Sequence, residues 1–205
     1  MQFDKCRVGI IDSGVDPGMV EVAGGVAITS QGLSTVYLDF LGHGTAVAAT
    51  IREKAPDAVL YAVKIFDQSL VTDIDRLIRA LDWCIDQRVD VINLSLGTPN
   101  DAHEKVLRDA LDRTHQTGIL VVAPGDGTLP GRLRGVLSVA ADQDCPRDTY
   151  RQDSNSASAR FAASGQALDP TLYGSSFAVA NFTGILVRDW NTTTPDSIHR
   201  SWLPE

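Results

Sequence analysis

Short apolar runs alternate with segments of helical spacing along most of the chain. The runs contain few polar residues, which is typical of strands that are covered on both faces of a sheet. They span residues 7–12, 58–66, 90–96, 119–123 and 135–141. Helical spacing covers residues 42–54, 73–88, 102–117 and 176–190. Because consecutive parallel strands need a crossover connection, this order predicts an α/β fold with a largely parallel sheet and helices on both faces.

The chain is long enough for one domain. Its 205 residues, 43% of them hydrophobic, suffice for a substantial core, and internal repeats are absent. We expect a single domain over residues 1–205, with a core over about 7–190 and a tail over 191–205. Weaker strand patterns fall at residues 26–29, 36–40 and 160–163, and the polar stretch 142–165 is expected to be mostly loop.

Three polar residues stand at the ends of these elements, where ligand sites gather in open α/β sheets. Asp12 ends the run 7–12, His43 begins the helical segment 42–54, and Ser176 begins the last helix. Taken singly, each has an ordinary role, as a turn former, a helix cap or a core residue. Taken together, they supply the nucleophile, the base and the orienting carboxylate that acyl transfer to serine requires.

The residues around these three positions carry a more specific signal. They read Asp12-Ser13-Gly14, Gly42-His43-Gly44-Thr45-Ala46-Val47-Ala48 and Gly174-Ser175-Ser176-Phe177-Ala178. In this order they resemble the three active-site motifs of the subtilisin-like serine peptidases, the subtilases, and the resemblance extends over about residues 7–190. It implies a three-layer fold with about seven mostly parallel strands. It also implies peptide-bond hydrolysis through an acyl-enzyme, with Asp12, His43 and Ser176 as catalytic residues.

Two further segments resemble substrate-binding parts of the family. One is similar to the strand whose backbone pairs with a bound peptide, and the other to the segment that shapes the pocket for the side chain before the scissile bond. They consist of Ser95, Leu96 and Gly97, and of Ala123, Pro124 and Gly125. By itself, the first segment is also compatible with a buried strand that turns at glycine.

The oxyanion hole is where the chain departs most from the family. Asp126 stands at the position of the family's asparagine, so the predicted hole consists of Asp126 and the backbone N–H of Ser176. An ionised aspartate offers a developing oxyanion only acceptors and adds repulsion. Three interpretations are open: catalysis on the remaining donor, a protonated Asp126 that donates, or a degenerate site.

We therefore expect a serine endopeptidase, slow or restricted in pH, that processes a selected protein or peptide precursor. The alternative is a catalytically weakened subtilase homologue that acts as a peptide-binding or scaffold protein. A nucleotide-binding domain is disfavoured, because the stretch 9–14 lacks the Gly-x-Gly-x-x-Gly pattern of dinucleotide sites.

No cofactor and no metal site are expected from the sequence. Calcium, which many subtilases bind, cannot be assigned to particular residues, and Asp16, Asp39, Asp73 and Asp75 are interpreted as turn and cap carboxylates. The three cysteines lack the spacing of a zinc site or a disulfide framework and are interpreted as idle thiols.

The expected partner is a peptide or protein substrate. The net charge of −8 and the pI near 4.9 disfavour nucleic acid and anionic membranes as partners. Because few residues follow Ser176, a partner chain could complete the domain. The first residues lack the apolar core of a secretion signal, which favours a cytoplasmic protein, although a secreted precursor trimmed of its leader would look the same.

Overall fold

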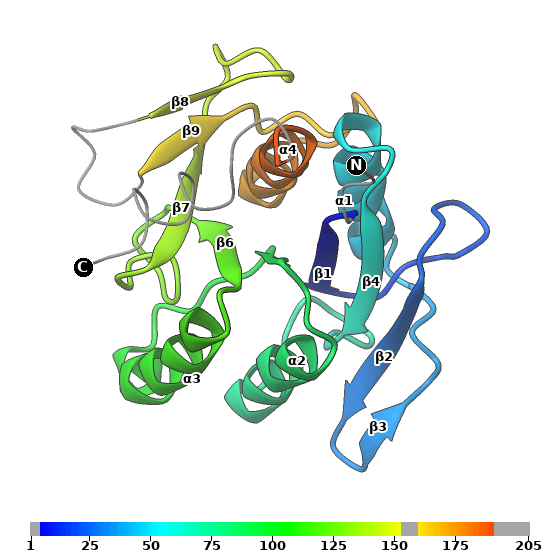
Figure 1. The fold of residues 1–205 in the computed structure, drawn as a ribbon, viewed down its shortest axis with the longest axis vertical. Coiled ribbons are helices and arrows are strands. Elements are labelled where there is room, and N and C mark those ends of the chain that lie inside the picture. The colour runs from blue at the N-terminus through cyan, green and yellow to red at the C-terminus, as the bar shows by residue number, and fades with distance from the viewer. Residues whose placement is uncertain (1–4, 153–159, 191–205) are drawn as a thin grey trace.

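The computed structural model describes residues 5–152 and 160–190. Within these ranges one nine-stranded sheet has the order β3-β2-β4-β1-β5-β6-β7-β9-β8 (Figure 1). The seven inner strands, from β2 to β9, pair in parallel, and β3 and β8 are antiparallel edge strands. The α/β fold and the mostly parallel sheet expected from the sequence are confirmed.

The strands are β1 Arg7–Asp12, β2 Gly24–Thr29, β3 Gly32–Ser34, β4 Val59–Lys64, β5 Val91–Leu94, β6 Leu120–Pro124, β7 Val136–Ala141, β8 Tyr150–Gln152 and β9 Phe161–Ala163. The helices are α1 His43–Lys54, α2 Ile74–Asp86, α3 Glu104–Gln116 and α4 Ser175–Arg188, with a 3₁₀ turn at Asp101–His103.

Helices cover both faces of the sheet and divide the core into two layers. On one face, α1 and α4 pack against each other and against one set of buried strand residues. On the other face, α2 and α3 cover the alternate residues of the same strands (Figure 1). Two-sided burial explains why the inner strands read as continuous apolar runs in the sequence.

The central strand β1 places the first candidate residue. It pairs with β4 on one side and with β5 on the other, so its last residue, Asp12, lies at the carboxyl edge in the middle of the sheet. The side chain of Asp12 is fully buried there. A carboxylate at this position needs a polar partner, because burial of an unpaired charge is costly.

The strand expected at residues 36–40 does not form, and that sequence-based expectation was wrong. Val36 and Phe40 are largely exposed, and the backbone between them is engaged by single contacts instead of a ladder. The N–H of Val15 donates to the carbonyl of Tyr37 at 3.1 Å, and Lys64 Nζ donates to the carbonyl of Leu38 at 2.9 Å. Apolar residues that look like a strand here form an exposed loop beside α1.

Two other expectations from the sequence concern the cysteines and the tail of the chain. The three cysteines are free and buried, at positions 6, 84 and 145. The tail expected over 191–205 lies outside the described residues.

The approach of α1 to β1 depends on Gly44 in the first turn of the helix. A Cβ atom at this position would lie 2.2 Å from the carbonyl oxygen of Gly14 and 3.1 Å from Asp12 Cβ. Both neighbours belong to the strand end and the tight turn after it, so neither can move aside cheaply. Glycine therefore lets the helix start in contact with the end of the strand.

We predict that Gly44→Ala lowers the free energy of unfolding by about 1–3 kcal/mol, the usual cost of overpacking a rigid contact. Urea denaturation of both proteins measures the difference. Gly18→Ala is the matched control, because a Cβ there would meet only the flexible side chain of Asp16, at 3.2 Å. Equal stability of the Gly44→Ala variant and the wild type would show that α1 can shift without cost.

Candidate active site

Asp12 and His43 form a hydrogen-bonded pair in which Asp12 is buried and His43 is partly exposed. His43 Nδ1 lies 2.8 Å from Asp12 Oδ1, and the His43 side chain is 19% exposed while that of Asp12 is 0% exposed. Asp12 Oδ1 also accepts a hydrogen bond from the N–H of Ser13 at 2.7 Å. Because an ionised carboxylate only accepts, this geometry places a proton on Nδ1 and leaves Nε2 of a neutral imidazole as a base.

The pKa of His43 reflects a competition. Burial lowers it, but the hydrogen bond to Asp12 and the negative charges of Asp12 and Asp39 outweigh the burial, so that the net effect raises the pKa above its ordinary value. The charged imidazole is thus stabilised in the place where it would form during proton transfer.

Ser176 is brought to the same edge of the sheet by the start of α4. Its Oγ donates a hydrogen bond to the carbonyl oxygen of Ser95, just after β5, at 3.3 Å. The ring of the next residue, Phe177, lies 5.7 Å from the imidazole of His43 between centroids. Among the described residues no hydrogen bond joins Ser176 to His43, and such catalytic contacts are often loose before substrate binds.

A chain of buried hydrogen bonds fixes Ser95 beneath the site. Thr183 Oγ1, on α4, donates to Asn93 Oδ1 at 3.0 Å, and Asn93 Nδ2 donates to Ser95 Oγ at 2.9 Å. All three side chains are buried. A paired polar chain of this kind holds α4 in a defined position on β5.

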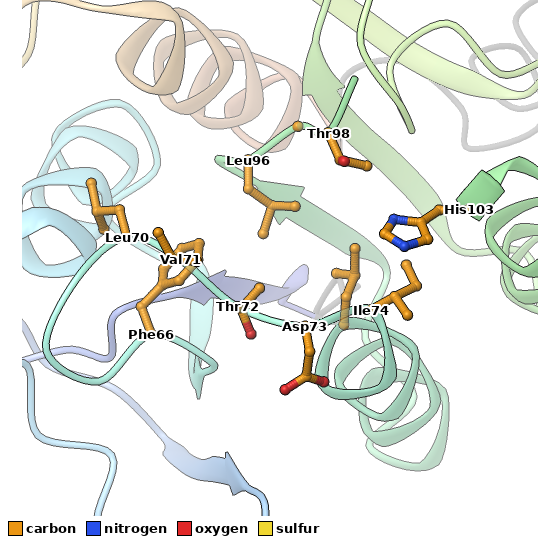
Figure 2. A pocket seen from close by; sticks show the side chains of 11 residues that line it. Phe66, Leu70, Val71, Thr72, Asp73, Ile74, Leu96, Thr98 and His103 are labelled. Atoms are coloured by element: carbon orange, nitrogen blue, oxygen red, sulfur yellow. The ribbon is translucent and has the colours of Figure 1, made fainter. Parts of the chain in front are cut away.

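A pocket lies beside the predicted substrate-binding segment at Leu96 and Gly97. It has a volume of about 260 Å³ and lies between the loop after β4 and the segment after β5. Phe66, Leu70 and Val71 line one side, and Leu96, Thr98 and His103 line the other (Figure 2). Most of its lining residues are apolar, and the polar ones are Thr72, Asp73, Thr98 and His103.

The second predicted substrate-binding segment, Ala123 to Gly125, is buried at the end of β6. It is tied to the first segment indirectly. Thr98 and Leu129 exchange two backbone hydrogen bonds, at 2.8 and 2.9 Å. The loop after β6 therefore runs beside the segment after β5.

Asp126 is exposed and acts as an acceptor. Its Oδ1 accepts hydrogen bonds from the N–H of Thr128 at 3.1 Å and from Thr128 Oγ1 at 2.6 Å. This is an Asx turn, a local arrangement that stabilises the loop. The side chain of Asp126 therefore acts as an acceptor in this loop.

The comparison with known proteins agrees with this geometry. The model of the subtilase family (Peptidase_S8) matches residues 4–200. The chain belongs to the subtilase family. Within the matched residues, the structure brings together Asp12 and His43, two of the residues that the sequence motifs single out.

Several curated relatives of this subtilase are known by name. Minor extracellular protease Epr of Bacillus subtilis is 36% identical over 155 residues, which are 67% of this chain and 23% of Epr. The thermostable alkaline protease of Halalkalibacterium halodurans is 33% identical over 70% of this chain and 44% of its own length. Subtilisin DY of Bacillus licheniformis is 29% identical over 80% of this chain and 62% of its own length. The matched part of this chain thus spans less than two thirds of these relatives.

Two residues to which the sequence analysis gave no role in the site lie close to His43 in this subtilase. Ser13 and Asp39 hydrogen-bond to each other and to the first turn of α1. Asp39 carries the turn-and-cap role that its residue type suggests, but its position beside His43 depends on how the exposed loop folds back. Only its place four residues before His43 could have drawn attention to it.

Within ranges 5–152 and 160–190, no group of three or more His, Cys, Asp or Glu side chains is arranged to hold a metal ion. Asp16 and Asp73 accept hydrogen bonds from the N–H groups of Gly18 and Arg76, as turn and cap residues do. In the same part of the chain, no helix has the length and apolar character needed to cross a bilayer.

The raised pKa of His43 predicts a pH-dependent contribution to stability. The charged pair stabilises the folded protein below the ordinary histidine pKa of about 6.5, and this contribution is lost as the pH rises through the raised value. Asp12→Asn removes the charge. The difference in unfolding free energy between wild type and variant should therefore be larger at about pH 5 than at about pH 8.

Urea denaturation at both pH values measures this difference, with His43→Gln as the control. In that background Asp12→Asn should lose its pH-dependent component. A difference of the same size at both pH values would contradict the assignment of the charge to the Asp12–His43 pair.

Proposed function

We propose that this chain is a serine endopeptidase that hydrolyses peptide bonds through an acyl-enzyme. The observation that carries the proposal is the hydrogen bond of 2.8 Å between Asp12 and His43 at the sheet edge to which α4 brings Ser176. In this assignment Ser176 Oγ attacks the carbonyl carbon and His43 Nε2 accepts its proton. Asp12 holds the imidazole tautomer and stabilises its charged form.

In the first half of the reaction, the proton that His43 has accepted is passed to the leaving group. The tetrahedral intermediate collapses as His43 gives the proton to the leaving amine, which departs and leaves the acyl group on Ser176. A water then repeats the sequence, with His43 again as the base, and releases the carboxylate product. The free backbone N–H of Ser176, in the first turn of α4, supplies one donor to the oxyanion.

The substrate is proposed to lie along two segments. Ser95, Leu96 and Gly97 offer backbone groups for pairing with an extended peptide, and Ala123, Pro124 and Gly125 form the neighbouring wall. The apolar pocket between Val71 and Leu96 supports this placement, because it provides room for a substrate side chain next to that backbone (Figure 2).

Asp126 supports the proposal of a slow or pH-restricted enzyme. Since the carboxylate accepts two hydrogen bonds from Thr128, it is oriented as an acceptor. Stabilisation of the oxyanion then falls mainly on the N–H of Ser176. Removal of one oxyanion-hole donor typically costs about 10²–10³-fold in turnover, which slows a reaction without abolishing it.

The same observation favours a second candidate function. A subtilase homologue with an acceptor in the oxyanion hole could retain the peptide-binding cleft and have lost useful turnover. It would then act as a peptide-binding or scaffold protein. Selective processing of a precursor, a cytoplasmic location, one domain over residues 1–205 and a partner chain that completes it stay predictions from the sequence.

We predict that a fluorophosphonate probe labels the wild-type protein and that Ser176→Ala abolishes the labelling. The probe reacts with a serine only when a base activates it. Ser175→Ala is the matched control, since it removes the adjacent hydroxyl in the same turn of α4 and should leave the labelling intact. Absence of labelling at every pH, together with retained peptide binding, would favour the scaffold function.

We predict that Asp126→Asn raises kcat on a generic peptide substrate by about tenfold or more, because it restores a donor and removes a repulsive charge. Turnover across pH, measured for both proteins, tests this. Thr128→Val serves as the control, because it loosens the Asx turn but adds no donor, and it should not raise turnover. An unchanged rate and pH profile in Asp126→Asn would show that Asp126 lies outside the oxyanion hole.

A further inference from the structure

The carboxylate of Asp39, in the loop before α1, is surrounded by donors. Its Oδ1 accepts hydrogen bonds from Ser13 Oγ and from the N–H groups of Leu41 and Gly42, each at 2.9 Å. Its Oδ2 accepts from the N–H of Thr45 at 2.9 Å and from Thr45 Oγ1 at 2.7 Å. Because every partner donates, the surroundings suit an ionised carboxylate.

The hydrogen bonds keep this half-buried group charged. Burial alone would raise the pKa of Asp39, but the hydrogen bonds from Thr45, Leu41 and Ser13 outweigh it, and the net effect lowers the pKa. Asp39 therefore carries a full negative charge throughout the range in which a histidine titrates.

The start of α1 needs such a charge. His43 is the first residue of this helix, where the free N–H groups carry partial positive charge and disfavour a positive imidazole. The first turn contains no acidic residue, and the N-cap residue Gly42 has no side chain with which to cap it. Asp39, which lies outside the helix, supplies both the capping acceptor and the negative charge. It accepts a hydrogen bond from the N–H of Thr45 and places an anion at the N-terminus of α1.

Ser13 connects Asp39 to the Asp12–His43 pair. Its N–H donates to Asp12 Oδ1 at 2.7 Å, and its Oγ donates to Asp39 and accepts the N–H of Gly44 at 2.9 Å. The two carboxylates thus hold His43 in different ways. Asp12 contacts Nδ1 directly, whereas Asp39 binds the backbone on both sides of the histidine.

The charged groups that act on His43 within the described residues are these two carboxylates. On the α4 side the imidazole meets the uncharged ring of Phe177. The nearby Lys64, on β4, directs its Nζ to the carbonyl of Leu38 at 2.9 Å and over the ring of Phe40 at 4.7 Å. Its cation thus supports the loop that carries Asp39.

We propose that Asp39 is a positioning residue for the reaction. It fixes the first turn of α1 so that His43 meets Asp12, and it supplies a second negative charge to offset the helix end when the imidazole becomes positive. This role rests on the proposed function, in which His43 takes the proton of Ser176.

The test compares wild type with Asp39→Asn, which removes the charge and keeps the size of the side chain. The midpoint of the His43 titration, followed by NMR of the imidazole and assigned with His43→Gln, should fall by roughly half to one pH unit. The acidic limb of the kcat/KM profile should move to lower pH by the same amount. The maximal rate should fall severalfold, because the side-chain amide points a donor at Thr45.

Three further variants separate the effect of the Asp39 charge from the structural effect of its hydrogen bonds. Thr45→Val removes one donor to Asp39 but keeps the charge, so the rate should fall while the midpoint stays. Asp57→Asn makes the same change in net charge at an exposed residue just before the amino end of β4, whereas Asp12 and His43 lie at the carboxyl ends of the strands. This variant should change neither the His43 midpoint nor the maximal rate. Asp39→Ser is a second neutral variant, for use if the asparagine prevents folding.

An unchanged midpoint in both neutral variants, or an equal shift in Asp57→Asn, would overturn the proposal. The NMR titration needs no turnover. If the wild type neither cleaves peptides nor reacts with a fluorophosphonate, the proposed function fails, and the His43 midpoint still decides the role of Asp39.

Discussion

The hydrogen bond between Asp12 and His43 depends on a carboxylate that cannot move. Asp12 ends a central strand with partners on both sides, and its side chain is fully buried. His43 must therefore be positioned against the carboxylate of Asp12. Helix α1 does this because Gly44 lets its first turn touch the end of β1, and Asp39 together with Ser13 holds the N–H groups of that turn. The contact between Asp12 and His43 thus depends on how α1 packs against the end of β1.

The third side chain is positioned by a separate set of constraints. Helix α4 packs against α1 on the same face of the sheet, and buried hydrogen bonds from Thr183 through Asn93 to Ser95 anchor it on β5. Ser176 is consequently tied to a strand next to β1 and not to β1 itself. The polar contacts that hold α1 therefore differ from those that hold α4, although the two helices pack against each other.

The sequence predicts those parts of the molecule that burial on two sides determines. Inner strands appear as apolar runs, and Asp12, His43 and Ser176 stand at element ends within specific motifs. What it does not predict depends on contacts between distant loops. The residues 36–40 look like a strand, yet their backbone groups bind Val15 and Lys64 singly. The exposed edge strand at Tyr150–Gln152 has no apolar pattern to reveal it. Asp39 is visible as a capping residue, but only the folded loop shows that it caps the helix of His43.

On the proposed assignment, the carboxylates near His43 and the carboxylate of Asp126 act in opposite senses. Asp12 and Asp39 favour a positive imidazole and so favour removal of the serine proton, whereas Asp126 presents an acceptor where negative charge would develop. Since both charges exist together in the transition state, only the balance of the two effects sets the rate. A weak oxyanion hole is best compensated by binding energy from remote parts of the substrate, which holds the carbonyl against the remaining donor. The pocket between Val71 and Leu96 offers such remote contacts. Substrates that fill it would gain most, which is a physical reason to expect selective cleavage over bulk digestion.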